Sequence, residues 1–192
     1  MYYVKTLLIL TVIASTLLSQ EVVNKDNYST IATSFNGISY EAVLNKKHGF
    51  ALGGDAFYWD KNLSYNIGIY YNNYFDKKSM KRKKTGKIIG TVFQGWGPFT
   101  KFRNLEGTTY DEDKNKFRYS AQYLCVGLHY SKKRIFNWGI TLDTRIGYGV
   151  PIEITEFKWI TNEPSQNARI FEKLTRFVTS GMDFGVTIGY SF

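Results

Sequence analysis

The chain has 192 residues, a formal net charge of +9 and a mean hydropathy of -0.29. That mean hydropathy excludes a bundle of membrane-spanning helices, each of which needs about 20 mostly apolar residues. The single cysteine excludes an intramolecular disulfide and a zinc site built from cysteines. Aromatic residues make up 17% of the chain and proline is rare, a composition that favours strands over a helical bundle.

The first twenty residues predict a secretory signal peptide. Lys5 supplies a positive charge, residues 7–14 form a short apolar run, and small residues follow. The apolar run is too short for a membrane-spanning anchor. We therefore expect cleavage close to Gln20, which removes residues 1–20 and leaves residues 21–192 as one domain.

Eight segments after the signal peptide alternate between apolar and polar side chains, as strands with one apolar face do. They are residues 27–35, 38–45, 49–59, 64–75, 87–97, 118–130, 136–149 and 182–192. The pair Asn36 and Gly37 between the first two segments favours a two-residue hairpin turn. No further apolar run is long enough for a helical span, so we expect an all-β fold. The predicted architecture is a single antiparallel up-and-down transmembrane β-barrel of about eight strands.

The last segment has the clearest alternation. One face carries the apolar side chains of Met182, Phe184, Val186, Ile188, Tyr190 and Phe192, and the other carries Asp183, Gly185, Thr187, Gly189 and Ser191. A strand between lipid and a polar lumen has this pattern. A soluble lipocalin-like barrel would instead turn the apolar face inward and carry an apolar ligand. The export signal, the glycines on the polar face and the terminal aromatic residue favour the membrane barrel.

An even number of strands places both chain ends on one side, which is the periplasmic side in bacterial barrels. The turns expected there are residues 45–48, 76–86 and 131–134, and the outward connections are 36–37, 60–63, 98–117 and 150–178. The long connections thus face outward, as is usual. Four apolar residues of the last connection have helical spacing: Ile170, Phe171, Leu174 and Phe177. This connection is expected to form either a short helix or an extension of the strands.

The last ten residues, DFGVTIGYSF, resemble the terminal strand that the barrel assembly machinery recognises in Gram-negative outer-membrane proteins. The matching positions are Phe184, Val186, Ile188, Tyr190 and Phe192. The segments ISYEAVLNKKHGF, GIYYNNYF and TRIGYGV are similar to those of a family of small, mostly uncharacterised, eight-stranded outer-membrane barrels. The resemblance implies an outer-membrane location, contact with outer-membrane lipid and insertion by the assembly machinery. It implies no particular reaction.

Charged residues on the polar faces predict a charged lumen. They are Glu41, Asp55, Asp143, Arg145 and Asp183. The interior of an eight-stranded barrel is filled by side chains, and charges there must be paired. We expect an internal ion-paired plug centred on Arg145; the alternative is an ion path or ligand site.

Catalysis is not expected. The only histidines, His48 and His129, lie near predicted periplasmic strand ends, and no nucleophile, carboxylate-pair or metal-ligand motif accompanies them. No cofactor and no metal site are expected. The alternatives from other functional classes are a lipid-modifying barrel enzyme and a narrow pore.

The strongest charge feature is a basic turn. It contains Lys77, Lys78, Lys81, Arg82, Lys83 and Lys84. We expect a solvated turn that anchors the strand ends at the membrane interface; the alternative is attraction of lipid phosphates or of an acidic partner. Nucleic acid is not an expected partner of an exported protein. The sequence therefore predicts a non-enzymatic outer-membrane protein that presents surface loops, whose ligand the sequence does not identify.

Overall fold

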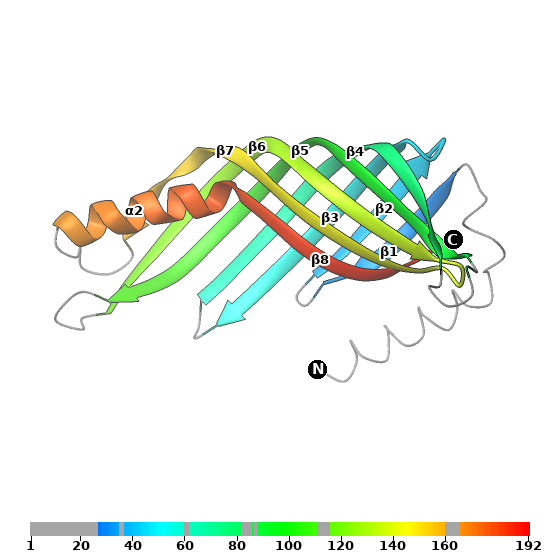
Figure 1. The fold of residues 1–192 in the computed structure, drawn as a ribbon. Helices are drawn as coiled ribbons and strands as arrows, with labels where there is room; N and C mark the ends of the chain where they lie inside the picture. The colour runs from blue at the N-terminus through cyan, green and yellow to red at the C-terminus, as the bar shows by residue number, and fades with distance from the viewer. Residues whose placement is uncertain are drawn as a thin grey trace.

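The computed structural model describes residues 27–34, 37–59, 62–81, 86, 88–110, 116–159 and 166–192. Eight antiparallel strands form a closed barrel, in which each strand pairs with its neighbours in sequence and β1 pairs with β8 (Figure 1). The predicted fold class is therefore confirmed. The predicted signal peptide (residues 1–20) and three members of the basic turn, Arg82, Lys83 and Lys84, lie outside the described residues.

The strands differ greatly in length. They are β1 (Tyr28–Thr33), β2 (Gly37–Leu44), β3 (His48–Trp59), β4 (Asn62–Lys81), β5 (Ile88–Tyr110), β6 (Lys116–Phe136), β7 (Ile140–Trp159) and β8 (Met182–Ser191). The helix α2 (Gln166–Gly181) connects β7 to β8. Strands β5, β6 and β7 consequently extend far beyond β1 and β2 at the end of the barrel away from the C-terminus (Figure 1).

The predicted connection 98–117 is wrong, because β5 continues to Tyr110 and β6 begins at Lys116. Inward aromatic side chains support these extensions: Phe99, Tyr119 and Tyr123 belong to one buried cluster with Tyr70, Ala121 and Cys125. Helix α2 covers this cluster, with Phe177 in edge-to-face contact with Tyr123 at 6.3 Å between ring centroids. For the predicted connection 150–178, both alternatives occur, since β7 runs to Trp159 and α2 follows.

Two predicted turns are also misplaced. Residues 131–134 belong to β6, and the turn lies at 137–139, where Gly139 has a φ of 88°. The run of basic residues suggested a turn, but Lys133 points into the barrel and finds a buried partner there. The turn predicted at 76–86 starts later, because β4 continues to Lys81 past a bulge between Tyr74 and Asp76.

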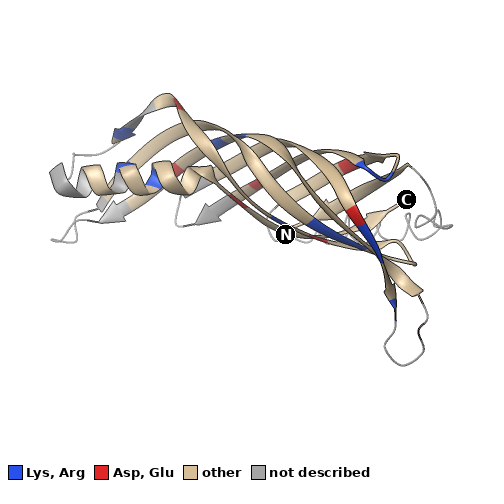
Figure 2. Ribbon diagram, turned by 45° about the horizontal axis from the view of Figure 1, so that its top comes forward, with Lys and Arg blue, Asp and Glu red and all other residues tan. Residues whose placement is uncertain are grey.

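The two faces of the strands have opposite character. Apolar side chains cover the outer face, where Phe184, Ile38 and Ile69 are 76%, 73% and 64% exposed. Figure 2 shows that charged residues occupy few positions along the strands. Tyr190 departs from the pattern at 8% exposed, because the backbone of Gly139 lies against its ring. The barrel thus has an apolar exterior and a polar interior.

Candidate functional site

A cavity of about 420 Å³ occupies the barrel interior. Its lining includes four acidic and four basic side chains: Glu41, Asp55, Asp143, Asp183, Lys101, Arg103, Lys133 and Arg145. Successive side chains of a strand point to opposite faces, and each of these residues occupies an odd-numbered position, which is on the inward face of its strand. Opposite charges in equal number allow a low-dielectric interior to hold all of them.

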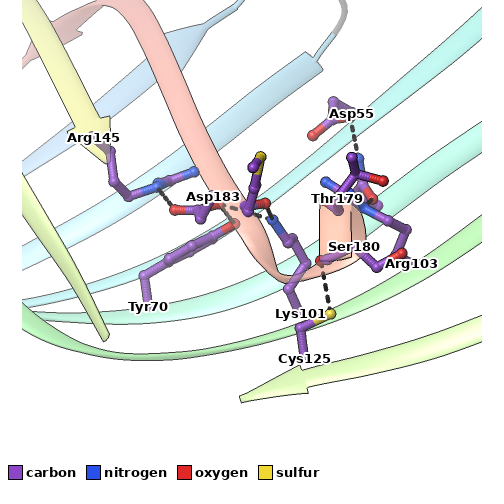
Figure 3. A network of polar contacts seen from close by, with 11 residues as sticks. Asp55, Tyr70, Lys101, Arg103, Cys125, Arg145, Thr179, Ser180 and Asp183 are labelled. Carbon is purple, nitrogen blue, oxygen red and sulfur yellow. Dashed lines mark hydrogen bonds and ion pairs between the residues drawn. The ribbon is translucent and has the colours of Figure 1, made fainter. Parts of the chain in front are cut away.

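Asp183 of β8 is the centre of the first ion-paired group (Figure 3). Its carboxylate accepts a hydrogen bond from Arg145 Nε at 2.6 Å and one from Lys101 Nζ at 3.0 Å. The Arg145 guanidinium also lies 3.7 Å from the ring centroid of Tyr70, whose hydroxyl donates to Asp183 over 3.4 Å. Three strands and β8 are therefore joined through one buried carboxylate.

A second set of contacts fixes the end of α2 to the barrel interior (Figure 3). Arg103 donates to the Thr179 carbonyl at 2.8 Å, and the Cys125 thiol donates to the Ser180 carbonyl at 2.9 Å. Lys101 donates to the Met182 carbonyl at 2.9 Å. The last carbonyls of a helix have no partners within the helix and carry its partial negative charge. These inward side chains of β5 and β6 therefore cap α2.

Asp55 joins this set through an amide. Asn66 donates to Asp55 at 2.6 Å and accepts from Arg103 Nε at 2.7 Å. A chain of hydrogen bonds therefore runs from β3 through β4 and β5 to the end of α2.

The second ion-paired group lies closer to the C-terminal end of the barrel. Lys133 pairs with Glu41, and the same carboxylate accepts hydrogen bonds from Asn72 and Tyr74, each at 2.8 Å. The Asn72 side-chain oxygen accepts from His129 and from Ser131, also at 2.8 Å each. Next to this group, buried and mostly large side chains form a hydrophobic cluster in the barrel interior: Tyr28, Val43, Tyr74, Phe93 and Ile135.

The five residues predicted to form the lumen network all line the cavity, but they divide into separate groups. Arg145 contacts Asp183, whereas Glu41 is paired with Lys133. The Oδ1 atom of Asp143 is buried with no hydrogen-bond partner in the part of the chain that the structure describes.

Sequence reasoning missed the basic partners Lys101, Arg103 and Lys133. The sequence pattern predicts a loop at Lys101 and Arg103 and a turn at Lys133, and neither prediction places the side chains in the lumen. Alternation could have identified them as inward residues. Lys101 and Arg103 continue the inward series that includes Phe99, and Lys133 lies between the inward residues Ser131 and Ile135.

The histidine prediction is wrong for His129, which is buried in the interior rather than at a strand end. His129 and Ser131 both bind the Asn72 oxygen and do not bind each other. They therefore lack the hydrogen bond between nucleophile and base that activates a serine. His48 is exposed and bonds to the Tyr71 hydroxyl at 2.7 Å.

The described part of the basic turn lies at the end of β4. Lys78 forms an exposed ion pair with Asp76 at 3.0 Å, and Lys77 Nζ lies 5.8 Å from the Phe93 ring centroid. Lys81 is exposed. Of the predicted assembly signal, Phe184, Val186 and Ile188 are exposed on the barrel exterior, and Phe192 exchanges two 2.9 Å backbone hydrogen bonds with Ser29.

Among the described residues, no group of three or more histidine, cysteine, aspartate or glutamate side chains is arranged to hold a metal ion. Within the same ranges, no helix has the length and apolar character needed to cross a membrane. A comparison of the chain with protein-family models and with curated protein sequences gives no match.

Proposed function

We propose that this protein is a non-enzymatic outer-membrane barrel whose lumen is closed by ion pairs. The ends of β5, β6 and β7 that extend beyond β1 and β2, together with α2, are presented at the cell surface. The observation that carries the proposal is the inverted polarity of the barrel, with an apolar exterior around a charged interior.

The apolar exterior supports a location in lipid. The outward residues with more than half of their surface exposed include Ile38, Leu52, Ile67, Ile69, Leu128, Ile146, Val150 and Phe184. They lie on six of the eight strands, and the two others have outward residues that are somewhat less exposed: Ile31 of β1 at 41% and Trp96 of β5 at 50%. Soluble monomers rarely expose apolar patches beyond a few hundred Å². Lipid removes that cost, and β8, with 10 residues, has the length of a membrane-spanning strand.

The charged interior argues against a soluble lipocalin-like carrier, because such a carrier needs an apolar cavity for its ligand. It also argues against a general pore. The interior of an eight-stranded barrel is narrow, and here Lys133, Glu41 and the cluster around Phe93 fill it on the C-terminal side of the cavity. The lumen therefore supports a structural barrel rather than a conducting one.

The part of the barrel that extends beyond β1 and β2 supports a role in presenting a binding surface to a partner. Strands β5 to β7 continue past the other strands, and α2 packs on their inner face. On its other side α2 exposes apolar residues: Ile170, Phe171 and Leu174. An exposed apolar helix face of this kind is typical of a surface that contacts a partner.

The experiment that tests the proposal is fractionation of a Gram-negative host that expresses the full-length chain. We expect the protein in the outer-membrane fraction, with an unboiled SDS-gel band that shifts on boiling because the folded barrel resists SDS. In planar bilayers, the purified barrel should give no steady conductance. A soluble periplasmic protein without a gel shift would refute the membrane location, and stable channels would refute the closed lumen.

A further inference from the structure

The outer face of β6 carries two cations near the C-terminal end of the barrel. Lys132 and Arg134 point outward, because residues 131, 133 and 135 between and beside them are buried in the interior. They lie four and two residues before Phe136, the last residue of the strand. At about 3.3 Å per residue, both are within roughly 13 Å of the strand end. The sequence predicts a solvated turn here, whereas the structure places both cations on the barrel wall.

These two cations have no counter-charge on the outer face. Counting only residues that the structure describes, the side chains of Lys132 and Arg134 form no ion pair and no hydrogen bond. On β4 the outward carboxylate Asp76 is already paired with Lys78 at 3.0 Å, and Asp143 of β7 faces the interior cavity on the other side of the wall. The neighbouring outward positions on β5 and β7 are uncharged: Val92, Gln94, Leu142 and Thr144. This part of the outer face therefore carries three cations against one carboxylate.

Gln94 adds a neutral donor beside the two cations. It lies directly opposite Lys132, which brings the two Cβ atoms to about 4.5–5.5 Å. Its side-chain oxygen accepts a hydrogen bond from the Tyr130 hydroxyl at 2.7 Å, and its amide nitrogen has no partner in the described part of the chain. Arg134 follows Lys132 on the same face at about 7 Å. An ammonium, a guanidinium and an amide group therefore lie within reach of one anion.

Exposed apolar side chains surround this group of donors. Trp96 and Tyr130 lie opposite each other on the side toward the middle of the barrel and are 50% and 38% exposed. Phe75 of β4 and Ile140 of β7 are exposed on the flanking strands. Aromatic residues of this kind lie at the membrane interfaces of barrels. Lysine and arginine at such a position lay their stems along the apolar surface and extend their charged ends to the headgroups.

We propose that Lys132, Arg134 and Gln94 bind the phosphate of an anionic phospholipid in the membrane leaflet at the C-terminal end of the barrel. The acyl chains of this lipid lie along Trp96, Tyr130 and the outward residue Leu128. Arginine and lysine form strong charge-assisted hydrogen bonds with phosphate. The positive excess favours a headgroup that has no cation of its own. This inference rests on the proposed membrane location.

An acidic segment of another protein is the competing occupant. Its carboxylates would have to lie between Trp96 and Ile140, among side chains that face lipid, where ionised groups are costly. A lipid phosphate is already at the interface and keeps its contact with water. The observations therefore favour the lipid.

The test removes both charges and keeps side chains of similar length. The variant is Lys132→Gln with Arg134→Gln, and Lys132→Gln alone provides a milder change. The matched control is Lys46→Gln with Lys47→Gln, which removes two charges from the turn between β2 and β3 at the same end of the barrel. Each full-length protein is reconstituted in vesicles of equal phosphatidylglycerol and phosphatidylcholine with the same chains, and retained lipid is counted by native mass spectrometry.

We expect the wild type and the control to retain phosphatidylglycerol over phosphatidylcholine by roughly twentyfold, since each cation at a membrane surface favours an anionic lipid by about fivefold. Lys132→Gln should lower the ratio by about fivefold, and the double variant should lower it to about one. Equal retention of both lipids by the wild type would overturn the proposal. An equal loss of preference in the control would do the same, because bulk charge would then explain it.

Two competitors test the identity of the occupant. Excess inorganic phosphate and poly-glutamate should each leave the bound phosphatidylglycerol in place. Displacement by inorganic phosphate would replace the lipid with a free anion as the occupant, and displacement by poly-glutamate alone would replace it with an acidic protein segment.

Unboiled gel bands of the same samples separate the two proposals. If the bands shift on boiling and no lipid preference is found, only the lipid site fails. If the protein does not insert and no shift is found, the membrane location fails with it.

Discussion

Lys133 and Glu41 form an ion pair inside the barrel, with 1% and 7% of their side-chain surfaces exposed. They come from β6 and β2, on opposite sides of the barrel in strand order, so the pair crosses the lumen. Asn72 and Tyr74 donate to the same carboxylate, and Lys133 Nζ lies 5.8 Å from the Tyr28 ring centroid and 5.9 Å from that of Tyr74. Few other arrangements would satisfy both charges, so the pair fixes the position of β2 relative to β6.

Removing one partner of this pair should destabilise the barrel strongly. Lys133→Met leaves the Glu41 carboxylate buried without its cation, which costs about 3–5 kcal/mol in comparable buried pairs. We expect a lower urea midpoint for unfolding from lipid vesicles and a lower temperature for conversion of the SDS-resistant band.

The double variant Glu41→Gln with Lys133→Met is the control for this prediction. It removes both charges and keeps side chains of similar size, so most of the lost stability should return. If the double variant is as unstable as Lys133→Met alone, packing rather than charge burial explains the effect.

Substituting an arginine for an apolar residue on the outer face of the barrel tests directly whether lipid surrounds this face. Ile69 lies in the middle of the outward face of β4, between Tyr65 and Tyr71. An arginine at mid-membrane costs about 2–4 kcal/mol in barrels, whereas near an interface the cost is about 0–1 kcal/mol. Ile69→Arg should therefore destabilise the barrel in vesicles by that amount.

Ser79→Arg on the same strand is the matched control, because Ser79 is exposed next to the basic residues Lys78 and Lys81. Equal and small effects of the two substitutions on the urea midpoint would mean that water, not lipid, surrounds Ile69.

The sequence predicted the strand number and the facing of most strands because alternation is a local property. Ile38, Phe50, Ile67 and Phe184 are all on the predicted outer face. Strand ends were less predictable. β5 and β6 continue past residue 97 and before residue 118 because Tyr119 and Tyr123 pack beneath α2, a contact between segments far apart in sequence.

The pairing of the interior charges could not be predicted for the same reason. Alternation places Glu41 and Arg145 in the lumen, but only the order of strands around the barrel and their stagger decide which charges meet. The sequence predicts a turn at Lys133 because this residue lies between Lys132 and Arg134, which face outward. A run of three basic residues in a strand is unusual, and only the buried carboxylate of Glu41 explains the middle one.

Because hydrogen bonds from Arg103 and Cys125 hold the end of α2 in the barrel, we expect the reactivity of the Cys125 thiol to show whether this helix is in place. Its side chain is 0% exposed and its thiol donates to the Ser180 carbonyl. A maleimide reagent should label the folded wild type very slowly and the boiled protein rapidly. Arg103→Ala removes the hydrogen bond to Thr179 and should speed labelling of the folded protein by about tenfold or more, since one lost charged hydrogen bond is worth about 1.5–3 kcal/mol.

Lys158→Ala serves as the control for charge removal, because Lys158 is exposed on β7. Its labelling rate should equal that of the wild type. If Arg103→Ala labels as slowly as the wild type, the arginine does not hold α2 in place.

Variants of Phe192 test whether the closing of the barrel and the proposed recognition during assembly depend on the same residue. Phe192 exchanges two backbone hydrogen bonds with Ser29, so deleting it removes part of the short seam between β8 and β1, whereas Phe192→Ala keeps both bonds. If the assembly machinery reads the aromatic side chain, Phe192→Ala should lower the amount of SDS-resistant barrel in cells but leave refolding into vesicles from urea unchanged. Deletion of Phe192 should reduce both, because the seam has few other residues to hold it. Equal yields of Phe192→Ala and wild type in cells would show that the aromatic side chain is not the assembly signal.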